Sequence, residues 1–416
     1  MNKIPKLRFP EFSGEWEEKK VKDIFDFYAT NSYSRNCLNN NNGTVKNIHY
    51  GDIHMKFPTI VDVENIHIPF INNDIDLNKI PKECYCKEGD VIIADASEDY
   101  AEIGKTVEIK NLGNEKILSG LHTMLARDNK GVTVNGYRGY MFLNENVRKQ
   151  IKILAVGAKV LGISKSNINK VSLNIPSKEE QQKISQFFTL IDKKIQKQQE
   201  KIEALQDYKK GMMQKIFSQK IRFKDENGYD YPNWQEKKLS EVLKERKTYS
   251  TKGLDYPHVT LSKDGIYAKG ERYERDFLVK TEDKKYKITL LGDICYNPAN
   301  LKFGVICINN YGNAIFSPIY VTFEVKKTFN NNYIGYFLMR RDFIDRVRKY
   351  EEGTVYERMA VKPEDFLKYK ASFPCLKEQE KIANFMLKID NKIIKEEEKL
   401  NLLNTWKKGL LQQMFV

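Results

Sequence analysis

The sequence predicts an α+β protein built by tandem duplication. Two domains of mixed α/β structure are expected, separated by two long antiparallel coiled-coil helices, with pseudo-two-fold symmetry. Three observations carry this prediction: short motifs that occur twice, an apolar coiled-coil pattern after one motif in each copy, and short β-rich runs between the motifs. A chain of 416 residues is long enough for two to three domains with buried cores.

The repeated motifs frame each copy. Segment 16–21 reads Trp-Glu-Glu-Lys-Lys-Val and returns 218 positions later as Trp-Gln-Glu-Lys-Lys-Leu. Segment 175–184, Ile-Pro-Ser-Lys-Glu-Glu-Gln-Gln-Lys-Ile, returns 198 positions later as Phe-Pro-Cys-Leu-Lys-Glu-Gln-Glu-Lys-Ile. The first copy therefore carries 20 extra residues between its two motifs. Self-similarity at this distance indicates a tandem duplication.

The stretches between the motifs agree at only a few points. Segment 89–92, Gly-Asp-Val-Ile, corresponds to 292–295, Gly-Asp-Ile-Cys, and predicts a turn that leads into an apolar strand. Segments 139–143 and 335–339 predict a helix that both copies share. Elsewhere the two stretches have almost nothing in common. Related frames with unrelated surfaces are what one protein needs in order to read two different targets.

Each copy ends in a coiled-coil pattern, in which apolar residues recur at alternating steps of four and three. The first copy has Ile184, Phe188, Ile191, Ile195, Ile202, Leu205, Met212 and Ile216, with Gln198 and Lys209 at two polar positions of the series. The second copy has Ile382, Met386, Ile389, Ile393, Leu400, Leu403, Leu410 and Met414, with Glu396 and Lys407.

The start of each helix is marked by a proline. Pro176 is followed by Ser177-x-x-Glu180, which predicts a capping box, and Cys375 replaces the serine in the second copy. Helices of about 38 residues would be about 57 Å long. Since neither can bury its apolar stripe alone, we expect the two to pair with each other in antiparallel fashion. Pairing of each helix with a partner chain is the alternative.

The stretches before the helices predict α+β domains. Short β-rich runs at 91–94, 106–109 and 319–323 alternate with turn residues and one helix. The expected organisation is a first domain at 1–175, a first long helix at 176–217, a second domain at 218–373 and a second long helix at 374–416.

Charge and composition favour a polyanionic partner. The net charge is +14 and the pI about 9.1, so nucleic acid is a candidate, although a merely soluble basic protein would look similar. Six cysteines form no C-x-x-C pair. The charged N-terminal segment and the lack of any run of about 18 uncharged apolar residues indicate a cytoplasmic protein without a membrane span.

Candidate catalytic and metal motifs are weak. Gly104-Lys105-Thr106 lacks the first glycine of a phosphate loop, and Asp95 with Glu108-x-Lys110 could mimic a nuclease but also fits a structural strand. No glycine-rich turn for a methyl donor stands out. Three histidines (His49, His54 and His67) precede Cys84 and Cys86, but zinc sites usually have tighter paired spacing. We therefore predict no catalytic residue, cofactor site or metal site in this chain.

Basic residues near aromatic residues are the better candidates for binding, because Lys and Arg contact phosphates and Arg also reads guanine edges. A solvated helix face is the alternative. The candidate DNA-binding residues are Arg138, Arg148, Lys149, Lys152, Lys159 and Lys165 in the first domain, and Arg340, Arg341, Arg346, Arg348, Lys349, Arg358 and Lys362 in the second.

The whole chain resembles the DNA-specificity (S) subunits of type I restriction–modification systems. The resemblance rests on the opening segment from Pro5 to Trp16, on the Pro-x-x-x-Glu-Gln segments at 176–181 and 374–379, and above all on the duplication. In that family two target-recognition domains read a bipartite double-stranded DNA target, and the helices act as a ruler between them.

The resemblance also implies partners. Two modification (methyltransferase) subunits would dock on the helices and methylate adenine N6, and restriction (endonuclease and translocase) subunits would cleave. S-adenosylmethionine, ATP and Mg are then cofactors of the partner subunits. A stand-alone enzyme that cuts or methylates DNA is the rival interpretation, and a pure coiled-coil adaptor is a third.

Overall fold

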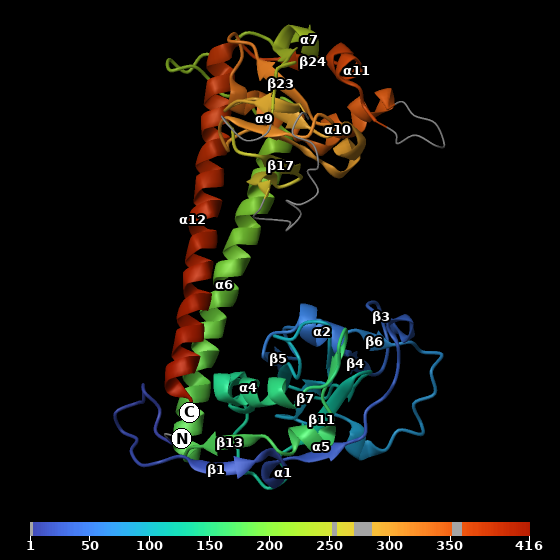
Figure 1. The fold of residues 1–416 in the computed structure, drawn as a ribbon, viewed down its shortest axis with the longest axis vertical. Helices are drawn as coiled ribbons and strands as arrows, with labels where there is room; N and C mark the ends of the chain where they lie inside the picture. The colour runs from blue at the N-terminus through green and yellow to red at the C-terminus, as the bar shows by residue number, and fades with distance from the viewer. Residues whose placement is uncertain (1–2, 252–255, 270–284, 352–359) are drawn as a thin grey trace. The chain divides into compact units, whose positions relative to one another are not determined.

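The structure is a computed structural model, which describes residues 3–251, 256–269, 285–351 and 360–416 (Figure 1). The chain divides into two compact units. Unit 1 comprises Met1–Lys201 with Glu396–Val416, and unit 2 comprises Ile202–Lys395. Each unit therefore contains one α+β domain and a part of each long helix. No helix of the described residues is both long and apolar enough to cross a membrane.

The two long helices are α6 (Lys178–Phe217, 40 residues) and α12 (Leu376–Met414, 39 residues). Ser177 Oγ accepts from the backbone N–H of Glu180 at 3.3 Å, which is half of the predicted capping box. The other half of the predicted capping box, a hydrogen bond from the Ser177 backbone N–H to the Glu180 carboxylate, is wrong. Arg8 binds that carboxylate instead. A glutamine ties each helix to the proline before it: Gln181 donates to the Pro176 carbonyl oxygen at 3.0 Å, and Gln379 to that of Pro374 at 2.8 Å.

The helices pair with each other in antiparallel fashion, as expected. In unit 1, Ile184 and Phe188 from the start of α6 share one core cluster with Leu410 and Met414 from the end of α12. The polar positions of the series are paired as well. Gln198 donates to the Glu396 carboxylate at 2.8 Å and to its carbonyl oxygen at 2.9 Å. These two residues are equivalents under the 198-residue repeat, as expected when two copies of one helix cross in opposite directions.

The domain of unit 1 contains two main sheets and several short helices. A five-stranded sheet has the order β2-β11-β7-β9-β5, and a four-stranded sheet has the order β10-β4-β6-β3; only the pairs β5–β9 and β4–β10 are parallel among their named pairs. The bounds are β2 Asp26–Tyr28, β3 Leu38–Asn39, β4 Lys46–Ile48, β5 Ile60–Asp62, β6 Phe70–Ile71, β7 Val91–Ala94, β8 Ala96–Ser97, β9 Thr106–Lys110, β10 Ile117–Ser119, β11 Thr123–Arg127 and β12 Leu161–Gly162. The helices are α1 Val21–Ile24, α2 Tyr50–Met55, α3 Arg138–Leu143, α4 Glu145–Leu154 and α5 Lys165–Ile168, with 3-10 turns at Arg35–Cys37 and Lys82–Cys84.

The domain of unit 2 repeats part of this plan. Its four-stranded sheet has the order β15-β23-β20-β21, which corresponds to β2-β11-β7-β9 in unit 1. The domain also contains a three-stranded sheet, β16-β19-β22, and the hairpin β17–β18. The strands are β15 Leu243–Glu245, β16 Tyr249–Ser250, β17 Val259–Ser262, β18 Gly265–Ala268, β19 Tyr286–Thr289, β20 Ile294–Tyr296, β21 Ile306–Ile308, β22 Ala314–Phe316 and β23 Val321–Val325. The helices are α7 Leu239–Val242, α9 Asn331–Leu338, α10 Arg341–Val347 and α11 Pro363–Lys368, with 3-10 turns at Pro298–Phe303 and Arg348–Tyr350.

The sequence motifs of the repeat pair with each other in space. In unit 1, β1 (Glu17–Lys20) lies antiparallel to β13 (Ser172–Ile175), and in unit 2, β14 (Gln235–Lys238) lies antiparallel to β24 (Lys370–Phe373). The two motifs of each copy thus close the domain at the point where the long helix begins.

The predicted strands mostly coincide with observed ones. The runs at 91–94 and 106–109 are β7 and β9, and both Gly-Asp turns precede strands, with φ of +78° at Gly89 and +85° at Gly292. The run at 319–323 is wrong at its start, because β23 begins at Val321. Tyr320 instead closes a turn, since its N–H donates to the Ser317 carbonyl oxygen at 3.1 Å.

Candidate nucleic-acid interface

Two of the basic residues expected to bind DNA are built into the first domain. Arg138 is 6% exposed, and its guanidinium donates to the carbonyl oxygens of Gly89 at 2.5 Å and Thr133 at 2.9 Å. Arg148 donates to three carbonyl oxygens, those of Ala101, Ile103 and Gly104, at 2.6–2.9 Å. Burial lowers the pKa of the Arg148 guanidinium. The structure does not support a DNA contact for either residue, because their donors already close loops within the domain.

The lysines of the same set lie on the surface. Lys149, Lys159 and Lys165 are exposed, and Lys152 is half-buried, with its ammonium 5.8 Å from the centre of the Tyr100 ring. Lys165 rests 5.2 Å from the centre of the Phe27 ring. Such long side chains can keep their stems on apolar surface while the charge stays available.

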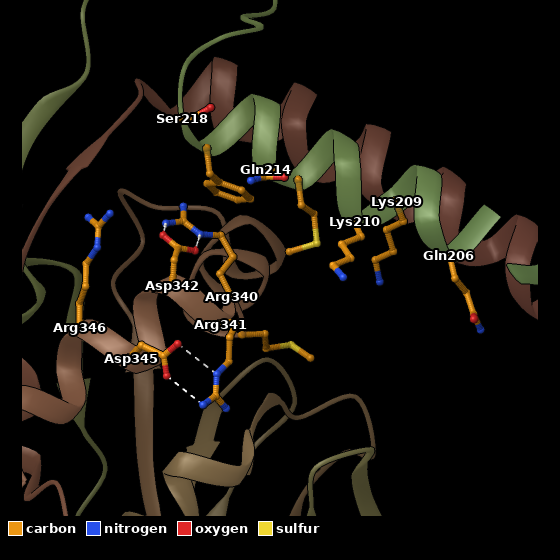
Figure 2. A pocket seen from close by; sticks show the side chains of 13 residues that line it. Gln206, Lys209, Lys210, Gln214, Ser218, Arg340, Arg341, Asp342, Asp345 and Arg346 are labelled. Atoms are coloured by element: carbon orange, nitrogen blue, oxygen red, sulfur yellow. Dashed lines mark hydrogen bonds and ion pairs between the residues drawn. The ribbon is translucent and has the colours of Figure 1, made fainter. Parts of the chain in front are cut away.

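In unit 2 the candidates gather around a groove of about 780 Å³ between the end of α6 and the segment that starts α10 (Figure 2). Arg340 lies on its wall and is not free. Its guanidinium pairs with Asp342 at 2.5 Å and lies over the rings of Phe217 and Phe337, 4.6 and 4.9 Å from their centres. Arg340 therefore attaches the start of α10 to α6 through Phe217 and to α9 through Phe337.

The other arginines of this groove differ in how far they are engaged. Arg341 pairs with Asp345 at 3.0 Å but keeps its side chain 63% exposed. Arg346 is exposed and has no ion pair or hydrogen bond within the described residues (Figure 2). Lys210 also lines the groove. An arginine whose side chain makes no ion pair is the stronger candidate for a phosphate contact, because binding does not first require an ion pair to break.

The remaining candidates follow α10. Arg348 pairs with Glu351 at 2.8 Å, and Lys349 is exposed. Lys362 precedes α11 and already has an interaction partner. Arg358 lies outside the described residues.

A three-residue cluster that the sequence patterns did not single out attaches each domain to the helices. In unit 1, Tyr140 donates to the Asp192 carboxylate at 2.7 Å, and Lys407 pairs with the same carboxylate at 2.5 Å. Unit 2 repeats the arrangement: Tyr336 donates to Asp390 at 2.6 Å, and Lys209 pairs with it at 2.5 Å. Burial, followed by the neighbouring aspartate, raises the pKa of both phenols.

The residues of these clusters belong to two separate sequence patterns. Lys209 and Lys407 occupy polar positions of the coiled-coil series, and the tyrosines lie in the shared helix segment. Only the fold brings the two signals together, because each cluster takes one residue from each of three elements.

The side chains of the weak enzymatic motifs bind backbone groups of their own domain. Glu108 is fully buried in β9 and accepts from the backbone N–H groups of Gly136 at 2.5 Å and Gly139 at 2.8 Å. Burial raises the pKa of its carboxyl to about 7. Lys105 donates to the His54 carbonyl oxygen at 3.1 Å rather than facing an open loop.

The histidine–cysteine group does not converge on a shared site. His49 accepts from the backbone N–H of Gly51, and His54 contacts the Ala96 carbonyl oxygen at 2.9 Å. Cys86 is buried, which raises the pKa of its thiol. Among the described residues, no three His, Cys, Asp or Glu side chains are grouped so that they could hold a metal ion.

The class of protein follows from a comparison with known families. The family model for the type I restriction modification DNA specificity domain matches residues 13–207 and again residues 231–405. The two matches together span most of the chain, and the chain belongs to this family.

Individual relatives agree with the family. The chain is 26% identical to the MjaX specificity subunit of a type I restriction enzyme from Methanocaldococcus jannaschii, over 97% of this chain and 93% of the relative. It is 24% identical to the MjaIX specificity subunit of the same organism, over 59% of this chain and 53% of the relative. The family is one of DNA-specificity subunits, so the role of this chain is DNA recognition rather than catalysis.

Solved structures show the same fold. The S subunit of M. genitalium superposes with a TM-score of 0.54 at 13% identity, and the alignment covers 99% of both chains. A chain from a study of complex assembly and conformational transition in a type I system superposes with a TM-score of 0.53 at 12% identity, over 96% of this chain and 97% of the other. Two α+β domains joined to two long helices are thus the architecture of this chain and of its structural neighbours.

Proposed function

We propose that each α+β domain reads one half of a bipartite double-stranded DNA target, and that the two long helices hold the readers at a defined separation. The observation that carries this proposal is the contrast between repeated attachments and unrepeated surfaces. The same contacts fasten both domains to the helices. The domains also share four strands of one sheet, but their side chains, additional strands and loops differ between the copies.

The partners follow from the same proposal. Two modification subunits would dock on the helices and methylate adenine N6 with S-adenosylmethionine, and restriction subunits would use ATP and Mg to cleave. The chain would work in the cytoplasm, where the DNA is. Its target-recognition domains would be residues 1–175 and 218–373, with helical spacers at 176–217 and 374–416.

The geometry refines the set of residues proposed to contact DNA. Exposed cations whose side chains make no ion pair or hydrogen bond within the described residues are retained first, and they are Lys149, Lys159, Arg346 and Lys349. Lys152, Lys165, Arg341, Arg348 and Lys362 are retained as secondary candidates, since each already has an intramolecular contact. Arg138, Arg148 and Arg340 are assigned to the architecture of their domains.

A domain exchange tests the proposal. Residues 25–155 would be replaced by the equivalent stretch of a relative, and methylated adenines mapped in cells that carry the chain with its modification subunit. One half of the methylated motif should change and the other remain. A change of both halves together would exclude two independent readers.

The exchange must preserve the attachment of the first domain to the helices. The stretch includes Tyr140, so the incoming segment must carry a tyrosine there to keep the bond to Asp192. The point variant Tyr140→Phe in the original chain is the control, because it weakens the attachment without changing the rest of the domain.

A further inference from the structure

A cleft of about 540 Å³ opens on the domain of unit 1, away from the attachments already described. It is lined by the two residues that follow strand β7, by the residue before β11, and by residues between the end of α4 and α5. Its side chains include Asp95, His122, Val156, Val160 and Ser164. The cleft combines acceptor, donor and apolar groups, the mixture that base edges in the DNA major groove require.

The backbone that frames the cleft is firmly held. The N–H of Ile163 donates to the Asp95 carbonyl oxygen at 2.8 Å, and β12 pairs with β8 beside it. Val156 and Gly162 exchange two hydrogen bonds, at 2.9 and 2.8 Å, which close the loop between them. Within that loop Gly157 has φ of +142°, and a Cβ there would lie 2.1 Å from the Val160 carbonyl oxygen. The loop is therefore closed at its base by backbone hydrogen bonds, and its tight turn requires a glycine at 157.

The apolar side chains of this loop are unusually exposed. Val156 is 74% and Val160 55% accessible, although both belong to a well-framed loop. Lys159 and Lys165 stand next to Val160 and Ser164 in the chain and are exposed. Apolar tips flanked by lysines suit a surface that approaches a base pair, with its thymine methyl, between phosphates.

The polar pair of the cleft is also available. His122 Nδ1 lies 3.2 Å from an Asp95 oxygen, and the two side chains are 52% and 32% exposed. His122 has φ of +54°, a conformation uncommon for a residue other than glycine. The edge of this imidazole packs against Tyr50, with ring centres 5.3 Å apart. Within the described part of the chain no second hydrogen bond engages either side chain, so each keeps a polar atom for a ligand.

The described residues of the second domain keep part of this frame, with different side chains. There the N–H of Val361 donates to the Pro298 carbonyl oxygen at 3.4 Å, as Ile163 does to Asp95. Strand pairing sets Met124 opposite Ile93 in one domain and Val321 opposite Tyr296 in the other.

Counting from these anchors gives the equivalent positions. Asp95 corresponds to Pro298, His122 to Ile319, and Ser164 to Lys362. An acid, an imidazole and a hydroxyl are thus replaced by a proline, an apolar chain and a cation. The backbone after the first position differs as well, because β8 follows Asp95, whereas Pro298 begins the 3-10 turn Pro298–Phe303.

We infer that this cleft is the base-reading site of the first domain, with Asp95, His122 and Val160 as specificity-determining residues. The inference rests on the proposed function, since it presumes that the first domain reads one half-site. Asp95 accepts from an exocyclic amino group such as that of cytosine, the imidazole bonds a neighbouring base edge, and Val160 contacts a thymine methyl or excludes a polar group.

The test uses the full chain with its modification subunit, in a host without other adenine methyltransferases. The variants are His122→Asn, which keeps a residue type that tolerates positive φ, and Val160→Ser at an exposed site. His67→Asn, an exposed histidine of the same domain outside the cleft, is the matched control. Mapped methylation should fall by roughly tenfold or more at the native first half-site, or shift to other bases there. The second half-site and the spacer should be unchanged, and the control should match the wild type.

Each other outcome has a defined meaning. Native sequence preference in both cleft variants would overturn the inference. Loss of both half-sites in a variant with the unfolding temperature of the wild type would also overturn it, because it would indicate a role in assembly. If the wild type itself produces no bipartite methylation pattern, the proposed function fails and the inference with it.

Discussion

In unit 1 the domain is fastened to the helices by Arg8 with Glu180 and by Tyr140 with Asp192, and in unit 2 by Arg222 with Glu378 and by Tyr336 with Asp390. The roles of α6 and α12 are exchanged, yet the chemistry is the same. Away from the helices the domains diverge. Strand β5 adds a fifth strand to one sheet, and the other has four.

The interiors differ as well. Glu108 lies buried in β9, whereas Ile308 stands at the corresponding place in β21 against Gly335. The comparison teaches that the attachments are constrained while the rest of each domain can change. A physical reason is that each attachment contains a buried or half-buried carboxylate, which needs its partner, whereas a sheet surface accepts many side chains.

The largest expected effect comes from breaking one attachment. Arg8→Met removes the arginine that pairs with Glu180, whose side chain is 2% exposed. Arg222→Met likewise removes the ion pair of Glu378, which is 0% exposed and keeps only the hydrogen bond from Trp234 Nε1 at 3.2 Å. Each change should lower the free energy of unfolding of its own unit by about 3–5 kcal/mol. Hydrogen exchange of the full chain, resolved by unit, measures this. Lys183→Met, at an exposed ion pair with Glu11, is the control and should cost about 1 kcal/mol at most. Equal protection in wild type and both arginine variants would refute the importance of the attachments.

The next effect is a difference between the two units in how their free energy of unfolding depends on pH. Burial raises the pKa of Glu108 to about 7, above its value in the unfolded chain. The stability it contributes is therefore fully present below the unfolded pKa of about 4.5 and is lost as pH rises through 7. The loss amounts to about 3 kcal/mol in unit 1. Unit 2, with Ile308 at that place, should lack this component.

Glu108→Gln provides the check on that assignment. It should remove the Glu108 contribution to the pH dependence of unit 1 stability between pH 4.5 and 7, whatever it does to stability at a single pH. Urea unfolding at several pH values, with hydrogen exchange to separate the units, supplies the slopes. An unaltered slope in unit 1 would show that another group titrates.

A smaller effect is expected from the phenol groups. Tyr140→Phe and Tyr336→Phe each delete one hydrogen bond to an aspartate that keeps its lysine, so each should cost about 1 kcal/mol. Tyr208→Phe, an exposed tyrosine of α6, should cost nothing measurable. Thermal unfolding of the three variants provides the comparison. A clear difference between Tyr140→Phe and Tyr336→Phe would show that the two attachments are not equivalent.

The smallest effect concerns individual phosphate contacts. Arg346→Gln and Lys149→Gln should weaken DNA binding uniformly across sequences and lower the slope of log affinity against log salt by about 1 each. Arg341→Gln should do less, because Arg341 already pairs with Asp345. Salt titrations of the assembled complex on one duplex give the slopes. A sequence-dependent loss for Arg346→Gln would assign that residue to base reading instead.

The sequence by itself determined the duplication, the two long helices and the class of protein. Helix periodicity is local, so the spacing from Ile184 to Ile216 was sufficient to predict α6, and the repeated motifs were sufficient to predict a common frame. The Gly-Asp turns before β7 and β20 were also predictable, because glycine, lacking a Cβ atom, adopts positive φ without steric cost.

Only the tertiary structure decided what the charged side chains do. Arg138 and Lys149 look alike in sequence, yet one is buried against the Gly89 carbonyl oxygen and the other faces solvent. Glu180 matches a capping box, but a longer-range arginine binds it. The physical reason is that a charged side chain takes the best partner within reach in three dimensions, and that partner can lie more than a hundred residues away in the chain.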